Sequence, residues 1–498
     1  MISLAQRADA QAAFPRTLDA ALRELDIAGI TADSRSAGPG MIFAALSGQR
    51  HDGRRFIGDA VARGAAAVLA ATGTDWPAGV ERRPLIEDAE PRRLLARIAA
   101  VLAGPAPRVL AAVTGTNGKT SSVDFLRQIW TLSGLAAASI GTLGVVTGGA
   151  VASGQDDGEN AVGGLTSPDA VALAAALARL ARRGVEHAGL EASSHGLDQF
   201  RLDGCEFAAA AFTNLTRDHL DYHGTMAAYR AAKLRLFEVL LREGATAVAS
   251  AALDEESREA LAAIAARRGL LLVLTGEAQE ADLRLVAARA VPEGQELVVA
   301  AHGTTRHIML PVAGRFQADN ALVAAALAEA LGTDPWPHLP HLAPVRGRME
   351  RVAVLAHGAA AYVDYAHTPD ALERLVAALR PHASGRIVLV FGAGGDRDPG
   401  KRALMGAAAR AADIAIVTDD NPRSEDPAAI RAAIVAACPG AIEIGDRAAA
   451  IAEGLAMLRA GDVLAVAGKG HEQGQIVGGQ VLAFDDASVV RALAGARS

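Results

Sequence analysis

The hydrophobic pattern of this chain is an alternation, in which short apolar runs are followed by longer stretches rich in Ala and Leu. The short runs predict strands and the longer stretches predict helices. Strands that alternate with helices form parallel sheets, which the helices cover. The pattern therefore predicts an α/β protein built on parallel sheets.

Two breaks divide this alternation. The stretch Gly104–Pro107 is typical of a linker, and it is preceded by strand-like runs at 29–31, 41–46 and 65–70. The second break is a proline cluster at Pro335, Pro337, Pro340 and Pro344. The breaks predict three domains, at residues 1–107, 108–338 and 339–498, and a chain of 498 residues has room for about three.

Polar segments follow seven of the predicted strands, each at the point where the strand ends. These strands are 109–113, 188–191, 208–212, 362–365, 387–391, 414–418 and 463–467. In parallel sheets, ligands bind beyond the carboxyl ends of the strands. We therefore expect the two larger sheets to present their functional groups along one edge each. The glycine-rich run 148–164 is predicted to be a loop.

The segment Gly115-Thr-Asn-Gly-Lys-Thr-Ser121 carries the strongest local signal, between an apolar strand and the helical pattern 123–132. Glycines allow backbone amides to surround phosphates, and a helix N-terminus favours anions. In such a loop the lysine, here Lys119, reaches the terminal phosphates, and the hydroxyl of Thr120 can hold Mg²⁺. The segment predicts nucleotide binding. Guanine is disfavoured because no lysine follows an asparagine, so the usual guanine-reading motif is missing.

Candidate metal and substrate groups follow other strands. Glu191 ends one strand, and another strand is followed by Asp218, His219, Asp221 and His223. Oxygen and imidazole groups at adjacent strand ends suit Mg²⁺ beside the phosphates. The alternative is that the acidic residues cap helices and that a histidine is buried in the core. In the last region, loops carry Arg348, Arg397 and Arg423, whose guanidinium groups suit carboxylates or phosphates, and Glu472 could receive an ammonium. Any one of these arginines by itself is more often a surface charge, but their recurrence at the sheet edge favours a functional role.

Composition narrows the classes of partner. Lys+Arg number 49 and Asp+Glu 56, so the net charge of −7 gives no overall basic field for nucleic acid or an anionic membrane. Two cysteines exclude a disulfide framework. Residues 1–20 lack the apolar core of a signal peptide, which predicts a cytoplasmic protein with no membrane insertion.

Lysine usage gives a sharper clue. Four of the 49 basic residues are lysines, namely Lys119, Lys233, Lys401 and Lys469. A chain that otherwise uses arginine is expected to keep a lysine where a compact ammonium is chemically required. Chance survival is the alternative. Lys233 lies in a helical pattern, where by itself it would be a solvated charge.

The residues alone predict an ATP-using, Mg²⁺-dependent enzyme whose last domain offers cationic and anionic groups to a zwitterion such as an amino acid. The competing class is a phosphate-loop switch or motor that couples ATP hydrolysis to movement. Such a protein needs a macromolecular partner, and no basic or aromatic-rich docking face is evident in the sequence.

Several motifs, taken together and in order, resemble the Mur ligases of peptidoglycan synthesis. They are TGTNGKTS (114–121), EASSHGL (191–197), NLTRDHLDYHG (214–224), AAK (231–233), DYAHTPD (364–370) and GKGHE (468–472). Within the family the chain is most similar to members that add 2,6-diaminopimelate, of which Asp420-Asn-Pro-Arg423 is typical. The resemblance implies an N-terminal α/β uridine-binding domain, a central P-loop parallel-sheet ATPase domain and a C-terminal Rossmann-like α/β domain that binds the incoming amino acid.

The resemblance also implies a role for each matching residue. Lys119, Lys233 and His219 would be catalytic, and Thr120, Glu191, His219 and Lys233, as its carbamate, would hold Mg²⁺. ATP would contact Gly115, Thr116, Asn117, Gly118, Lys119, Thr120, Ser121, Asn320, Arg348, Asp364 and His367. The UDP-linked muramoyl-dipeptide would contact Ser34, Thr166, Ser167, Ser193, Gln199 and Arg201. Diaminopimelate would contact Arg397, Asp420, Asn421, Pro422, Arg423, Gly468 and Glu472.

The implied reaction is ATP-dependent addition of meso-2,6-diaminopimelate to UDP-N-acetylmuramoyl-L-alanyl-D-glutamate through an acyl phosphate, in cell-wall precursor synthesis. ATP is the co-substrate, Mg²⁺ the cofactor, and the expected partners are small molecules bound by a monomer. A lysine-adding or folylpolyglutamate-type amide ligase is the alternative within the superfamily, and a non-synthetic ATPase is the alternative outside it.

Overall fold

The computed structural model describes residues 25–48, 51–151 and 166–495. Most of the predicted loop 148–164 and the N-terminal residues 1–20 therefore lie outside the described residues. The chain forms two compact units, one of Met1–Thr275 with Val323–Pro335 and one of Gly276–Leu322 with Trp336–Ser498. The boundaries of the three predicted domains stay a prediction. Within the described ranges, no helix combines the length and apolarity needed to cross a membrane.

The first sheet of the first unit is parallel, with the order β1-β2-β3-β4. Its strands are β1 (Gly29–Thr31), β2 (Met41–Ala44), β3 (Ala67–Ala71) and β4 (Leu85–Asp88). Alternate residues of a strand point to opposite faces. Ile42 and Leu69 thus pack in the cluster of α4 (Pro91–Ala103), and Phe43 and Val68 pack in the cluster of α3 (Ile57–Ala62). Both faces of this small sheet are buried, which confirms the predicted strands.

The second sheet of this unit contains parallel strands in the order β11-β10-β9-β5-β8-β6, and β7 runs antiparallel at the edge. The strands are β5 (Val109–Thr114), β6 (Ala137–Gly141), β7 (Gly144–Gly148), β8 (His187–Glu191), β9 (Phe207–Phe212), β10 (Leu241–Ser250) and β11 (Leu271–Gly276). The helical segments are α5 (Lys119–Leu132), α6 (Ala170–Arg182), α7 (Ser194–Asp198), α8 (Leu220–His223), α9 (Met226–Arg235), η4 (Leu236–Leu240) and α10 (Glu255–Arg268). The neighbouring strands β5, β8 and β9 end together, so the polar segments that follow them share one edge.

The second unit begins with an antiparallel meander, β12 (Leu283–Val291), β13 (Gly294–Ala301) and β14 (Thr304–Leu310), which the sequence pattern did not predict. Helix α11 (Arg315–Ala330) follows, and its residues from Val323 onward belong to the first unit. The six-stranded sheet of this unit has the order β15-β16-β20-β17-β18-β19, and it is parallel except for β15. Its strands are β15 (Glu350–Val354), β16 (Ala360–Asp364), β17 (Ile387–Phe391), β18 (Ile414–Val417), β19 (Ile442–Glu443) and β20 (Val463–Ala467).

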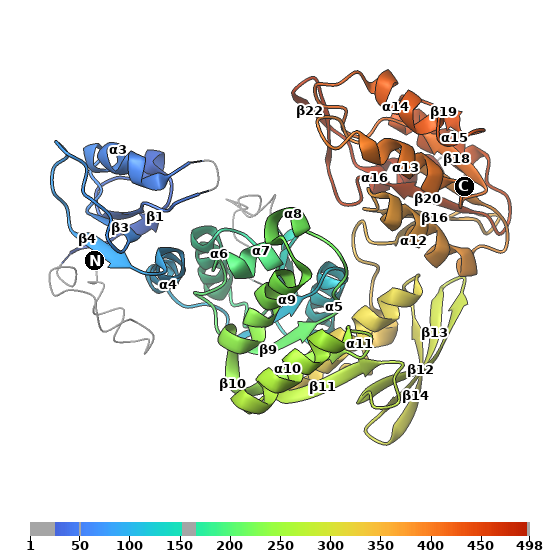
Figure 1. The fold of residues 1–498 in the computed structure, drawn as a ribbon. Coiled ribbons are helices and arrows are strands. Elements are labelled where there is room, and N and C mark those ends of the chain that lie inside the picture. The colour runs from blue at the N-terminus through green and yellow to red at the C-terminus, as the bar shows by residue number, and fades with distance from the viewer. Residues whose placement is uncertain (1–24, 49–50, 152–165, 496–498) are drawn as a thin grey trace. The chain divides into compact units, whose positions relative to one another are not determined.

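Helices cover both faces of the six-stranded sheet, as expected of a Rossmann-like fold. Helices α12 (Pro369–Leu379), α13 (Gly400–Ala409) and α14 (Pro427–Val435) pack on one face, and α15 (Arg447–Ala456) and α16 (Asp486–Gly495) on the other (Figure 1). The unit also contains η5 (Leu339–His341), η6 (Arg380–His382) and a hairpin of β21 (Gly474–Val477) and β22 (Gln480–Ala483). The predicted strands at 387–391 and 463–467 are confirmed residue for residue.

Candidate functional site

The loop between β5 and α5 has the geometry that a phosphate site requires. Gly115 has a φ of +147°, and a Cβ there would lie 1.9 Å from the Oγ1 of Thr213, so the position demands glycine. Gly118 has a φ of +86° and is the N-cap of α5. The loop is tied to the end of β9, because the backbone N–H of Asn117 donates to Oδ1 of Asn214 at 2.9 Å. The backbone of this loop is thus held at the positive end of a helix.

Lys119 and Lys233 meet at this loop. The Nζ of Lys119 donates to the carbonyl oxygens of Gly115 and Thr116, both at 2.9 Å. The Nζ of Lys233, from helix α9, donates to the same Gly115 oxygen at 2.7 Å. The structure therefore brings together two of the three residues expected to be catalytic.

Lys233 is buried and electrostatically uncompensated. It is 1% exposed, and its Nζ lies over the ring of Tyr229, 4.5 Å from the ring centre. Burial lowers the pKa of Lys233 well below its usual value, repulsion from Lys119 lowers it further, and Asp218 opposes the shift. Loss of the proton turns the ammonium into a nucleophilic amine, a reaction that the guanidinium of arginine cannot match.

The third expected catalytic residue, His219, lies just before α8 with a left-handed φ of +51°. Its backbone N–H donates to Oδ1 of Asp218 at 2.8 Å. Its ring packs edge-on against the ring of His195, with the centres 4.8 Å apart, and also against Tyr229. Tyr229 thus links the His219 segment to Lys233. Sequence reasoning missed His195, although it lies in one of the quoted motifs.

Glu191 ends β8 as predicted and is 3% exposed. Its Oε1 accepts from the backbone N–H of Thr142 at 2.7 Å, and its Oε2 accepts from the hydroxyl of the same residue at 3.1 Å. A Cβ on Gly141 would lie 2.1 Å from Oε1, so the close approach of this carboxylate requires glycine there. The fixed orientation is what a metal-binding or phosphate-facing carboxylate needs.

The carboxylate of Glu191 and the hydroxyl of Thr120 fit a Mg²⁺ ion that is held jointly with a nucleotide. The described residues contain no group of three or more His, Cys, Asp or Glu side chains that could hold a metal ion by themselves. Mg²⁺ is commonly bound by one or two carboxylates together with substrate phosphates and water. Glu191 provides a buried carboxylate, and Thr120, 9% exposed in the first turn of α5, provides a hydroxyl.

A continuous hydrogen-bond network joins five of the six residues expected to bind the dipeptide. Ser167 donates its hydroxyl to the carbonyl of Glu191 at 2.8 Å and lies 3.0 Å from the hydroxyl of Ser193. Arg201 donates to the carbonyl of Ser167 at 2.8 Å and to Oε1 of Gln199 at 2.7 Å. The hydroxyl of Thr166 accepts a weak bond of 3.4 Å from Thr142, the residue that also holds Glu191.

Ser34, the sixth residue expected to bind this substrate, lies apart from the network in η1 (Ser34–Ser36), in the N-terminal sheet region. Its neighbours Asp33 and Arg35 form an exposed ion pair of 2.8 Å. No described contact joins Ser34 to the Ser167 network.

In the second unit, four of the residues expected to contact ATP form another cluster, namely Asn320, Arg348, Asp364 and His367. Asp364 accepts from the backbone N–H of Met349 at 2.7 Å and of Ala366 at 2.8 Å. Burial raises the pKa of Asp364, and Arg348 opposes this. Arg348 lies over the ring of Tyr365, 4.8 Å from its centre.

The other two members are tied to the same segments. The Nδ2 of Asn320 donates to Oε1 of Gln317 at 2.9 Å, and Gln317 in turn donates to the carbonyl of Arg348 at 3.2 Å. His367 packs against Tyr365, with a distance of 4.6 Å between ring centres.

His471 is a further member of the cluster around Asp364 and Tyr365, and sequence reasoning assigned it no role. The centre of its ring lies 5.1 Å from that of Tyr365. Burial, with Arg348 and Arg346 nearby, lowers the pKa of His471 to about 4.

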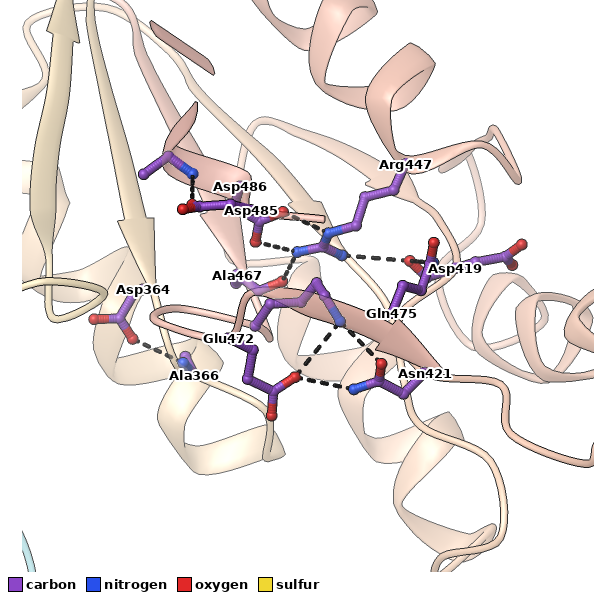
Figure 2. Close-up of polar contacts among 12 residues, drawn as sticks. Asp364, Ala366, Asp419, Asn421, Arg447, Ala467, Glu472, Gln475, Asp485 and Asp486 are labelled. Atoms are coloured by element: carbon purple, nitrogen blue, oxygen red, sulfur yellow. Dashed lines mark hydrogen bonds and ion pairs between the residues drawn. The ribbon is translucent and has the colours of Figure 1, made fainter. Parts of the chain in front are cut away.

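The segment 420–423 meets the loop after β20 at the edge of the same sheet (Figure 2). Asn421 donates to Oε2 of Glu472 at 3.0 Å. Gly468 has a φ of +118°, and a Cβ there would lie 2.5 Å from a carboxylate oxygen of Asp420. Arg423 has a φ of +54°, and its Nη1 donates to the carbonyl of Gly395 at 2.7 Å.

Two neighbouring loops extend this cluster. The carbonyl of Pro422 lies 2.0 Å from where a Cβ on Gly395 would stand, so the Gly395 loop packs directly on this segment. Arg397, two residues further along that loop, is exposed. The structure thus collects two guanidinium groups and two carboxylates around one sheet edge.

A buried ion pair beneath this edge was also missed. Arg447 and Asp486 are both fully buried, with a distance of 2.7 Å between Nη2 and Oδ2 (Figure 2). Arg447 also donates to the carbonyl of Ala467 at 2.9 Å, at the end of β20. The two partners lie 39 residues apart, so neither gives a local signal.

The chain matches three domains of one family. Residues 26–102 match the catalytic domain of the Mur ligase family, residues 113–328 the Mur ligase middle domain, and residues 347–470 the glutamate ligase domain of Mur ligases.

Two curated relatives carry the name UDP-N-acetylmuramoyl-L-alanyl-D-glutamate–2,6-diaminopimelate ligase. The protein from Caulobacter vibrioides is 55% identical over 94% of this chain and 96% of its own length. The protein from Rhizobium meliloti is 50% identical over 95% of each chain.

Solved structures agree with these matches. A structure of a UDP-N-acetylmuramoyl-L-alanyl-D-glutamate–2,6-diaminopimelate ligase has a TM-score of 0.72 and 32% identity, and covers 100% of this chain and 99% of its own. Folylpolyglutamate synthase of Mycobacterium tuberculosis, complexed with ADP, has a TM-score of 0.61 at 20% identity over 81% of this chain and 94% of its own, which shows a shared fold. By sequence and by fold, the chain belongs to the Mur ligase family.

Proposed function

We propose that this chain is an ATP-dependent amide ligase that adds meso-2,6-diaminopimelate to UDP-N-acetylmuramoyl-L-alanyl-D-glutamate in peptidoglycan precursor synthesis. The observation that carries the proposal is the near-full-length identity of about half to relatives named for this reaction. The phosphate loop around Gly115 and the charged cluster around Asn421 supply the two kinds of site that such a reaction needs.

The first step is phosphoryl transfer. A carboxylate oxygen of the D-glutamyl group attacks the γ-phosphorus of ATP, the bond to the β,γ-bridging oxygen breaks, and ADP leaves, which gives an acyl phosphate. Catalysis of such a step is mainly positioning and charge stabilisation. The loop 115–121 and Lys119 hold the phosphates, with His219 beside them, and Asn320, Arg348, Asp364 and His367 hold the nucleoside. The Ser167–Ser193–Arg201 network and Ser34 bind the UDP-linked dipeptide.

Thr120, Glu191, His219 and the carbamate of Lys233 would hold Mg²⁺, which would supply positive charge against the negative charge on the phosphoryl oxygens. The carbamate forms when the neutral amine of Lys233 attacks CO₂, which makes an N–C bond and releases one proton to water. The lowered pKa of Lys233 supports this assignment, because only the unprotonated amine reacts.

The second step forms the amide. The amine of diaminopimelate attacks the acyl carbon, phosphate leaves, and the nitrogen loses a proton. Arg397 and Arg423 bind carboxylates of the amino acid and Glu472 binds its second ammonium, with Asp420, Asn421, Pro422 and Gly468 shaping the pocket. L-Lysine lacks the second carboxylate, so a site that relies on two guanidinium groups disfavours it.

Residues 1–107 serve as the UDP-substrate domain, 108–338 as the ATP domain and 339–498 as the amino-acid domain in this proposal. The enzyme works as a cytoplasmic monomer on small molecules. The loop around Gly115 lies within 108–338 and the charged cluster around Asn421 lies within 339–498, which supports these assignments.

The test is phosphate release with ATP, Mg²⁺ and UDP-N-acetylmuramoyl-L-alanyl-D-glutamate, with meso-diaminopimelate, L-lysine or no amino acid, and with product masses recorded. We expect release and a mass gain with diaminopimelate alone. Turnover of lysine would retain an amide ligase and reject the assigned pocket. Release without an amide product would favour a simple ATPase.

A further inference from the structure

Lys469 is a buried lysine that the proposed mechanism does not use. It is one of four lysines in the chain, and it lies between Gly468 and Glu472 in the loop after β20. Its side chain is fully buried. A buried ammonium is costly unless it is hydrogen-bonded and paired with a negative charge. The partners of Lys469 therefore indicate what its retention achieves.

Three side chains, Lys469, Asn421 and Glu472, form a closed triangle at this point, and Figure 2 labels Asn421 and Glu472. The Nζ of Lys469 donates to Oδ1 of Asn421 at 2.9 Å and lies 3.5 Å from Oε2 of Glu472. The Nδ2 of Asn421 donates to the same Oε2 at 3.0 Å. Lys469 thus contacts both a residue of the 420–423 segment and the carboxylate expected to receive an ammonium.

The triangle determines which way the amide of Asn421 faces. An ammonium and a backbone N–H can only donate hydrogen bonds, and Asn421 receives one from Lys469 and one from Ile476, both at 2.9 Å. Both donors must meet the amide oxygen, so the NH₂ group has to face Glu472. A flipped amide would place NH₂ against two donors and its oxygen against a carboxylate.

This arrangement occupies one oxygen of Glu472 and leaves the other available. Oε2 faces both Asn421 and Lys469, whereas Oε1 has no hydrogen-bond partner among the residues that the structure describes. The side chain of Glu472 is 36% exposed. A carboxylate that is anchored through one oxygen and open at the other is prepared to accept an ammonium.

We propose that Lys469 is a positioning residue, whose buried ammonium orients Asn421 and Glu472 so that the free carboxylate oxygen meets the ammonium of the amino-acid substrate that does not react. This inference rests on the proposed function, because it takes diaminopimelate as the ligand. Lys469 acts through its two neighbours and does not contact the substrate.

Charge and geometry make opposite predictions for the loss of Lys469. If the ammonium only competed with the substrate for Glu472, its removal would strengthen substrate binding. If it positions Glu472, its removal frees Asn421 to rotate and Glu472 to move, and binding weakens. The direction of the change in KM therefore separates the two roles.

The decisive variant is Lys469→Met, which keeps an unbranched apolar side chain and removes the ammonium. We expect KM for diaminopimelate to rise about tenfold or more, the effect of a disturbed charge-assisted hydrogen bond. The value of kcat and the KM for ATP should change less than about twofold. L-2-Aminopimelate, which keeps the reacting amine and both carboxylates but lacks the second ammonium, should show nearly the same KM with both enzymes.

Two further variants sharpen the result. Lys401→Met removes the same charge in the same unit from a lysine that is electrostatically coupled to Asp420 but donates to the carbonyl of His367 at 3.4 Å. It should raise KM for diaminopimelate clearly less than Lys469→Met does. In an Asn421→Ala background, Lys469→Met should raise KM by a smaller factor than in the wild-type background, because one of the two residues through which Lys469 acts is already lost.

The outcomes separate this inference from the proposed function. If the wild-type enzyme forms no diaminopimelate product, the proposed function fails. If it forms the product, then an unchanged or lowered KM in Lys469→Met, or an equal rise with 2-aminopimelate, overturns the positioning role alone. Melting temperatures verify folding, and Lys469→Gln, which keeps a donor, provides a second measurement if Lys469→Met does not fold.

Discussion

Lys233 and Lys469 are both almost completely buried, yet the main charges near them are opposite in sign. Lys233 has a backbone carbonyl and an aromatic ring as partners and a second lysine nearby. Lys469 has an amide oxygen and a carboxylate, and Asp420 and Asp486 also favour its charge. Burial lowers the pKa of both lysines. At Lys233 the largest charge effect, from Lys119, lowers the pKa further, whereas at Lys469 the largest charge effect, from Asp420, opposes the shift and outweighs the lowering by Arg447. An uncompensated buried amine is suited to lose its proton and react, whereas a compensated one is suited to hold its neighbours in place.

The largest expected effect is on the reactive member of this comparison. Lys233→Arg cannot form a carbamate, so we expect kcat to fall at least about 10³-fold, and the melting temperature verifies that the variant is folded. NMR with ¹³C-bicarbonate should detect a carbamate signal in the wild-type enzyme and none in the variant. Turnover close to normal in Lys233→Arg would remove the carbamate from the mechanism.

The second prediction compares the stability of two variants, one that breaks a buried ion pair and one that removes a buried amine without a carboxylate partner. Asp486→Ala leaves the fully buried Arg447 without its carboxylate, and we expect the free energy of unfolding to fall by about 3–5 kcal/mol. Lys233→Met removes a buried amine that has no carboxylate bound to it, so the same urea titration should show unchanged or higher stability. An equal loss in both variants would contradict the contrast drawn between the two regions.

The third and smallest expected effect is on the pH dependence of stability, through His471. Like Lys233, His471 is a base whose neighbours include positive charges, although its side chain is only partly buried. Its pKa is about 4 in the folded protein, against 6.5 for an unperturbed histidine in an unfolded chain, so between these pH values the unfolded state binds more protons. Stability from the neutral ring is therefore complete above about pH 6.5 and is lost as the pH falls towards 4, by about 1–3 kcal/mol. His471→Gln should be less sensitive to pH across this range in urea titrations, and equal pH profiles would refute the assignment.

Much of the fold could be predicted from the sequence because its signals are local. Short apolar runs that end in polar, glycine-containing segments, such as 387–391 and 463–467, predict buried strands. Glycines at 115 and 118 predict a turn before a helix. The meander of β12–β14 escaped prediction because its exposed outer positions, such as Val286 and Met309, blur the alternation of a two-faced strand.

The sequence by itself determined which chemical groups the chain carries and where along it they lie. Strand-end motifs placed Lys119, Glu191 and Asn421 at the ends of strands, because a parallel strand must end in a loop on one edge. The scarcity of lysine also marked Lys233 and Lys469 before any contact was known.

Only the tertiary structure decided what these groups do to one another. Lys233 meets the carbonyl of Gly115 across 118 residues, and Lys469 meets Asn421 across 48. A shift in pKa depends on burial and on charges within a few ångströms, and both are properties of packing between distant segments. Two lysines that are alike in sequence therefore became a reactive amine and a positioning ammonium through the neighbours that folding supplied.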